Sequence, residues 1–242
     1  MVKLFRECLA FVFIFTIVNL CKAQTDYGYW TGIDLSKPLT KSLSINLSPE
    51  VRLSNSAEHF DDFLVSAGIQ FKILKWLQFE LGYRYSRFYE VDLDDRFNEH
   101  RYSVAFKPRF DFGRFTLTYR GQFQRSLIYW YSYGYSIETK DNFRNRLQVS
   151  YNIPNSKVDP FLMGEFYYDL TSGKDREFNR IRLRAGFTYP LKKRNEIQIF
   201  GQYQSKLNTG NPERSYVLGL FYSFEFRKFK PATADNELDQ GD

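Results

Sequence analysis

The sequence is poor in the residues on which most catalytic and metal sites depend. It holds two cysteines and two histidines in 242 residues. Both cysteines, Cys8 and Cys21, fall within residues 1–23, which we interpret below as a cleaved signal. The mature chain is then expected to have no thiol, which excludes a disulfide, a thiolate nucleophile and a cysteine-ligated metal. Two histidines also argue against a zinc site, and we predict neither a metal nor a cofactor.

Long apolar runs are equally scarce. The most apolar run, 9–20, is short for a membrane-spanning helix. It follows the basic residues Lys3 and Arg6 and precedes a small-residue cleavage motif, as in a secretory signal peptide. We predict a signal over 1–23. Lipid attachment at Cys21 is disfavoured because a leucine, not a small residue, precedes it.

A concentrated basic patch is absent as well. The net charge is +6, of which +2 belongs to the predicted signal, and the basic residues are dispersed along the chain. Export of the protein and the dispersion of its basic residues both disfavour nucleic-acid binding. No phosphate-binding glycine loop or long-period repeat is found. The partners that we expect are outer-membrane lipid and the barrel-assembly machinery, with the oligomeric state left open.

What the chain has in abundance is alternation of apolar and polar residues. From 43 to 53 every second residue is apolar or proline, and the pattern returns in segment after segment to Phe226. Successive side chains of a strand point to opposite faces, so each strand has one oily and one polar face. Behind a signal peptide, this pattern predicts an all-β transmembrane barrel in the outer membrane, oily outside and polar inside.

The strand count follows from the number of alternating segments. The alternation predicts strands at 27–36, 41–53, 62–72, 76–88, 99–111, 114–127, 142–153, 160–169, 179–190, 196–206 and 215–226. Bacterial barrels usually have an even number. We therefore expect an antiparallel up-and-down barrel of about ten strands over 41–229, with 24–40 as an N-terminal segment or extra strand, and twelve strands as the alternative.

The predicted connections alternate short and long, with the long ones at 54–61, 87–98, 126–141, 170–178 and 207–214. Long loops are typical of the outer side, and short turns of the periplasmic side. The apolar alternation through 114–141 is too long for one crossing, so that strand either projects from the membrane or turns near Arg125–Ser126. Residues 230–242 carry four acids and no aromatic residue, and we expect a disordered periplasmic tail.

The polar face is rich in charge, and it is the main candidate site. By parity the lumen is expected to hold Glu50, Arg52, Glu80, Arg84, Glu99, Arg101, Lys107, Arg120, Arg144, Arg146, Glu165, Asp169, Arg180, Arg182, Arg184 and Glu196. One interpretation is a structural network in which the arginines pair with Glu99, Glu165 or their neighbours. The other is a basic constriction that selects anions in a small, porin-like pore.

Other residues offer weaker alternatives. The aromatic residues Tyr129, Trp130, Tyr131 and Tyr133 could contact a ligand at the outer rim or belong to the interfacial girdle. Asp92, Asp94 and Asp95 lack the spacing of a calcium loop. A lipid- or ligand-acting barrel enzyme would need a serine and histidine together. His59 lies in a loop, and His100 has the opposite parity to Ser103, so we predict no catalytic residues and no enzyme activity.

Short motifs along the chain carry a family resemblance. They are Trp30, Glu50-Val51-Arg52, Gly82-Tyr83-Arg84, Glu99-His100-Arg101, Arg144-Asn145-Arg146, Pro160-Phe161 with Glu165, and Asn179-Arg180-Ile181-Arg182. In this order the chain resembles domain-of-unknown-function family 2490, outer-membrane barrels common in Bacteroidetes-type Gram-negative bacteria. The resemblance implies the fold and the location, and it carries no established activity.

Overall fold

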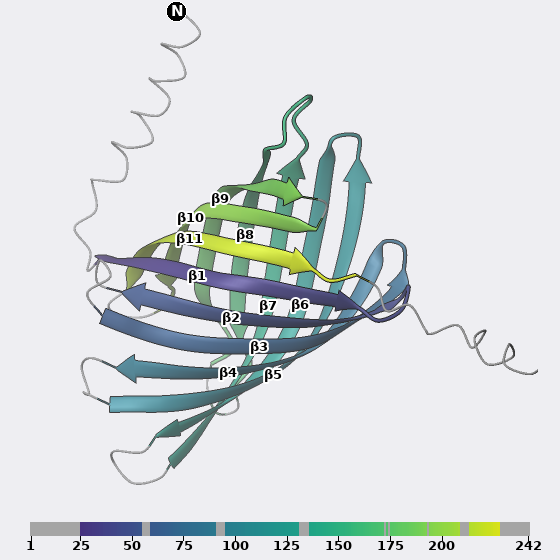
Figure 1. Cartoon of the computed structure of the whole chain (residues 1–242). Coiled ribbons are helices and arrows are strands. Elements are labelled where there is room, and N and C mark those ends of the chain that lie inside the picture. Colours follow the sequence, from purple (N-terminus) through teal and green to yellow (C-terminus); the bar gives the residue numbers. More distant parts are fainter. Residues whose placement is uncertain are drawn as a thin grey trace, which may run out of the picture.

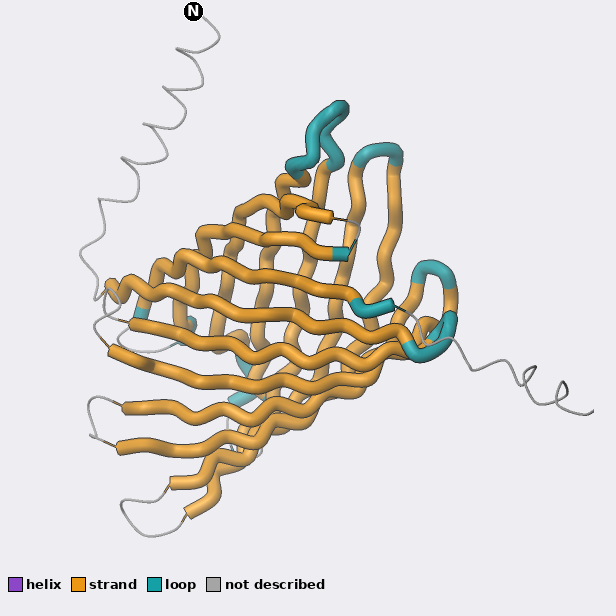
Figure 2. Tube along the Cα trace, in the orientation of Figure 1, coloured by secondary structure: helices purple, strands orange, loops and turns teal. Residues whose placement is uncertain are grey.

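The computed structural model describes residues 25–54, 59–90, 95–130, 136–171, 173, 175–192, 194–208 and 213–227. Figure 2 shows that these residues form strands joined by turns and loops. The strands are β1 (Thr25–Pro38), β2 (Leu43–Ser54), β3 (His59–Leu74), β4 (Leu77–Glu90), β5 (Asp95–Phe112), β6 (Phe115–Trp130), β7 (Ser136–Tyr151), β8 (Asp159–Asp169), β9 (Phe178–Lys192), β10 (Asn195–Lys206) and β11 (Arg214–Glu225). Within this described part, no helix is long and apolar enough to cross a membrane. The predicted signal and tail lie outside it.

The strands close into one barrel in chain order. Each strand pairs antiparallel with the next, while β1 pairs parallel with β11, and Figure 1 shows these two side by side and pointing the same way. The prediction of about ten strands is confirmed in number, and the prediction of a purely antiparallel sheet is wrong at this seam. The reason is geometric: strands that alternate in direction leave the first and last parallel whenever their number is odd.

The segment with the uncertain role, 24–40, supplies β1, which is bonded to both β2 and β11 along its length. Residue 25 lies beside Arg214, and β11 ends beside Ser36. The chain therefore enters the barrel at one end and leaves it at the other. We call these ends the N rim, where β1 starts, and the C rim, where β11 ends.

The connections are more even in length than the sequence suggested. Those at the N rim are 55–58, 91–94, 131–135, 170–177 and 207–213, and those at the C rim are 39–42, 75–76, 113–114, 152–158 and 193–194. The strands continue into most of the predicted long loops, because backbone pairing extends past the last strictly alternating residue. β6 is one unbroken strand paired with β7 from Phe115 to Trp130, so no turn occurs near Arg125.

The two faces of the sheet separate as the alternation requires. Large apolar side chains project from the outer face, with Leu162 at 66% and Phe112 at 62% exposure, while charged and amide side chains line the interior. A soluble protein rarely exposes so much continuous apolar surface. Towards the N rim the outer face carries charge, and Arg125 on β6 pairs with Asp141 on β7 at 2.7 Å there.

The interior also holds a small apolar cluster of four side chains. Phe161 and Met163 of β8 pack on Phe200 of β10, and Phe221 of β11 stacks against that ring with centroids 5.8 Å apart. Phe200 is only 1% exposed. Side chains therefore fill part of the lumen, as expected in a narrow barrel.

Candidate functional site

Two cavities lie in the interior, and we call them chambers. A chamber of about 730 Å³ reaches the C rim, where Phe224 and Glu225 line it, and one of about 840 Å³ reaches the N rim, where Asp26 and Glu213 line it. Five side chains line both chambers and mark the layer between them: Trp30, Arg52, Arg84, Arg101 and Arg182. They come from β1, β2, β4, β5 and β9, so the layer draws on strands around the barrel.

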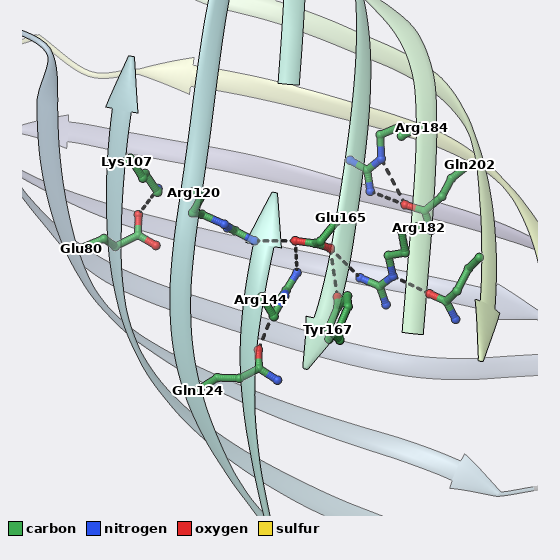
Figure 3. A network of polar contacts seen from close by, with 11 residues as sticks. Glu80, Lys107, Arg120, Gln124, Arg144, Glu165, Tyr167, Arg182, Arg184 and Gln202 are labelled. Atoms are coloured by element: carbon green, nitrogen blue, oxygen red, sulfur yellow. Dashed lines mark hydrogen bonds and ion pairs between the residues drawn. The ribbon is translucent and has the colours of Figure 1, made fainter. Parts of the chain in front are cut away.

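The centre of the charged layer is Glu165 on β8, which is 2% exposed (Figure 3). Its Oε1 accepts hydrogen bonds from Arg120 Nη2 at 3.1 Å and Arg144 Nη2 at 2.8 Å. Its Oε2 accepts one from the Tyr167 hydroxyl at 3.1 Å, and Arg182 Nη1 lies 3.6 Å from the same oxygen. One buried carboxylate thus holds three guanidinium groups from three neighbouring strands.

Register explains why these residues meet. Arg146 on β7 lies directly opposite Glu165, and Glu165 lies opposite Arg182 on β9. Directly opposed residues of an antiparallel pair have Cβ atoms about 4.5–5.5 Å apart, so long side chains reach across. Arg120 and Arg144 approach from the adjoining positions on β6 and β7.

Glutamines hold the outer edges of the same arginines. Arg144 Nη1 donates to Gln124 Oε1 at 3.2 Å, and Arg182 Nε donates to Gln204 Oε1. Arg184 donates from Nε and Nη2 to Gln202 Oε1 at 3.2 and 2.8 Å. Figure 3 shows the guanidinium groups directed into the lumen between these partners. A neutral acceptor fixes the geometry without cancelling the charge.

Aromatic rings support the layer from β1 and β8. The guanidinium of Arg52 lies 3.9 Å from the Trp30 ring centroid, and that of Arg182 lies 5.4 Å from it. Arg144 and Arg182 lie 4.6 and 5.0 Å from the Tyr167 ring. Desolvated cation–π contacts of this kind are favourable and rigid, so Trp30 links the arginine of β2 to that of β9.

The wall formed by β2 to β5 is more evenly balanced. Its ion pairs are Arg52 with Glu50 at 2.7 Å, Arg52 with Asp62 at 3.5 Å, Arg101 with Glu99 at 2.7 Å, and Lys107 with Glu80. The first and third pairs join residues two apart on one strand, and Lys107 reaches from β5 to β4. Each carboxylate here has a nearby cation.

The wall formed by β6 to β9 has an excess of positive charge. Among the described residues, Arg146, Arg180 and Arg184 form no ion pair with a carboxylate, and neither does Arg84 on β4. Arg146 also lies directly opposite Arg120 on the neighbouring strand, an arrangement that is unfavourable for like charges. Of the four arginines that the sequence offers for pairing, Arg144 and Arg182 contact Glu165, Arg146 and Arg184 form no ion pair with a described carboxylate, and Glu99 pairs with Arg101.

All of the charged side chains predicted for the lumen line one or both chambers. Those on the C chamber are Glu50, Arg52, Glu80, Arg84, Arg101, Lys107, Arg120, Arg144, Arg146, Glu165, Arg182, Arg184 and Glu196, and those on the N chamber include Arg52, Arg84, Glu99, Arg101, Asp169, Arg180 and Arg182. The uncharged partners of these charges were not predicted from the sequence: Trp30, Tyr167, Phe200 and the three glutamines contact the arginines from inward positions. Their inward parity is the signal that could have found them.

The aromatic residues that the sequence offers for an outer-rim contact lie on different faces of the sheet. Tyr129 lies on the outer face, with its ring 5.3 Å from that of His100. Trp130 stacks inside on Phe97 at 4.5 Å, and Phe97 stacks on Phe88 at 5.1 Å. Tyr131 and Tyr133 lie outside the described residues, as do Asp92, Asp94 and the side chains of His59 and Asp95.

His100 and Ser103 are not brought together. His100 Nδ1 is hydrogen-bonded to the Tyr83 hydroxyl at 2.8 Å on the outer face, and the Ser103 hydroxyl lines the C chamber. Among the residues whose positions are described, no group of three histidine, cysteine or acidic side chains is placed to hold a metal ion.

Two solved structures are similar to this chain. A "Bacterial polysaccharide outer membrane secretin" superposes with a TM-score of 0.51 at 10% identity, covering 78% of this chain and 67% of that chain. The β domain of the Bordetella autotransporter Brka gives a TM-score of 0.47 at 12% identity, covering 80% and 87%. No curated protein matches the sequence.

The sequence also matches the model of a family described as "Protein of unknown function (DUF2490)" over residues 27–215. The match begins inside β1 and reaches the start of β11, so it takes in β1 as part of the family domain. The likeness to the secretin is at low identity and supports the fold alone. This chain belongs to the DUF2490 family of proteins of unknown function.

Proposed function

We propose that the protein is a non-enzymatic outer-membrane β-barrel whose lumen is closed at mid-height by a charge network. The observation that carries this proposal is the convergence of Arg120, Arg144 and Arg182 on the buried carboxylate of Glu165. A buried carboxylate bound by several guanidinium groups gives a rigid arrangement rather than a wet passage. The side chains that line both chambers, Trp30 among them, lie where the two chambers meet, and Arg182 belongs to both this layer and the Glu165 cluster.

The membrane location is part of the proposal. Its support is the continuous apolar outer face, bounded by aromatic side chains such as Trp76 and Phe110, which stack at 5.8 Å near the C rim. Lipid is the solvent that suits this face, and closure of the sheet leaves no unpaired edge within it. Outer-membrane lipid and the barrel-assembly machinery are the partners that this location implies.

A closed lumen predicts that the purified protein does not conduct. In planar bilayers we expect the wild-type protein to give no sustained open-channel current. Replacing Trp30, Arg52 and Arg182 together by alanine removes three side chains of the dividing layer, and we expect this variant to conduct. Current through this variant would show that the purified protein inserts into the bilayer. It is therefore the control for a wild-type protein that gives no current.

The rival interpretation, an anion-selective pore, predicts a different record. Wild-type protein would then conduct with anion preference, and Arg182→Gln would shift the selectivity towards cations. That outcome would contradict the closed lumen.

We further propose that the N rim faces outside the cell and the C rim faces the periplasm. Arg125 and Asp141 form an ion pair on the outer face near the N rim. Charged side chains on this face favour strands that extend beyond the lipid there, as strands do on the outer side of such barrels. Single cysteines at Glu213 (N rim) and Lys157 (C rim), both exposed positions, would be the only thiols of the mature chain. On intact cells we expect an impermeant thiol reagent to label Glu213→Cys and not Lys157→Cys, and labelling of the second alone would invert the orientation.

A further inference from the structure

The charge around Glu165 does not balance. Arg120, Arg144 and Arg182 contact its carboxylate, and Arg146 lies directly opposite it across the β7–β8 pair. Both oxygens are already engaged, by two guanidinium groups on Oε1 and by a tyrosine hydroxyl and a third guanidinium on Oε2. One carboxylate therefore lies among four guanidinium groups, and Arg146 forms no ion pair with a described side chain.

A second uncompensated cation lies close by. Arg184 lines the C chamber together with Arg146, and it lies opposite Met163, two residues before Glu165 on β8. Gln202 accepts hydrogen bonds from Nε and Nη2 of Arg184, and the Phe200 ring lies 3.7 Å beneath its guanidinium. One edge and one face of this group are thus fixed by neutral partners. Its positive charge remains available to the chamber.

Burial of an excess of positive charge is costly unless a counter-charge accompanies it. Guanidinium groups match oxyanions best, because their paired N–H donors meet two oxygens in parallel. The C chamber, at about 730 Å³, has room for such a group and is open at its rim. We propose that the C chamber binds an oxyanion of the carboxylate or phosphate class between Arg146 and Arg184.

Such an oxyanion has two possible sources. One is a small solute that enters at the C rim. The other is the chain itself, because the last residues of β11, Phe224 and Glu225, line the same chamber and the acidic segment 231–242 follows them in the sequence. The chemistry is the same in both cases, and the two sources are separated by the experiment.

The test is calorimetric titration of inorganic phosphate into the full-length protein in a non-ionic detergent. We expect saturable binding at one site, and Arg146→Gln and Arg184→Gln should each weaken it about tenfold or more, since each removes charged hydrogen bonds. The matched control is Arg87→Gln, which removes one exposed arginine from the outer face and should leave binding unchanged. Arg146→Gln should also be no less stable than the wild type without phosphate, because it removes an uncompensated charge.

A second arm uses the full chain with Asp235, Glu237, Asp239 and Asp242 changed to their amides. If a solute is the natural anion, phosphate affinity is unchanged in this variant. If the tail supplies the oxyanion, affinity rises when the tail is neutralised. Absence of saturable binding in both the wild type and this variant would overturn the proposal, as would equal affinity in the Arg146→Gln/Arg184→Gln double variant.

Discussion

Replacing Glu165 by glutamine is expected to lower the free energy of unfolding by about 3–5 kcal/mol, because it leaves buried guanidinium groups without their counter-charge. Arg120, Arg144 and Arg182 all contact this side chain, and Glu165 itself is 2% exposed. The amide keeps one acceptor oxygen but turns a donor towards one of the arginines. Both the lost charge and the opposed donors act in the same direction.

The measurement is reversible urea unfolding of the detergent-folded barrel, read by tryptophan fluorescence and by the gel shift between folded and unfolded forms. The matched control is Glu213→Gln. Glu213 also contacts a basic side chain at 2.7 Å, Lys206, but it is 64% exposed at the N rim. Exposed pairs contribute about 0–1 kcal/mol, so equal losses in the two variants would show that the Glu165 cluster is as hydrated as the surface.

Two-residue alternation alone assigns the charged side chains to the lumen face. Parity depends only on the chain's own backbone, so Glu50, Arg144 and Arg182 could be assigned to the interior without knowing any neighbour. The outward position of Leu162 and Phe112 follows from the same rule. These assignments needed no tertiary information.

The identity of ion-pair partners could not be obtained in this way. Glu165 meets arginines of β6, β7 and β9 because of the stagger between strands, and the sequence does not encode that stagger locally. Glu99 illustrates the limit, since its partner is Arg101 two residues along β5 rather than an arginine of β7 or β9. Parity gives the face of a residue, and register gives its contacts.

The parity argument also treated the lumen as a purely polar space. Phe200 of β10 has inward parity and lies beneath the guanidinium of Arg184, so an apolar ring forms part of the charged site. The ring is accommodated because Gly186 and Gly219 lie next to it. Local sequence does not reveal that a glycine on one strand makes room for a ring on another.

The close approach of Gly219 to the Phe200 ring predicts the second large effect on stability. Gly219→Ala is expected to destabilise the barrel by about 1–3 kcal/mol through overpacking. A Cβ at Gly219 would lie 2.0 Å from Cζ of Phe200. Movement of the ring is opposed by Phe221, which stacks on it, and by Arg184, whose guanidinium covers it.

A double-mutant cycle isolates this contact. In a Phe200→Leu background the ring is gone, so adding Gly219→Ala should cost little, and the coupling between the two sites should account for most of the single-variant loss. Gly201→Ala is the matched control on the neighbouring strand, because a Cβ there meets nothing within 4 Å. It is expected to change stability by no more than about 0.5 kcal/mol. If Gly219→Ala and Gly201→Ala behave alike in urea unfolding, the lumen around Phe200 is looser than this packing implies, and the closed lumen loses its apolar support.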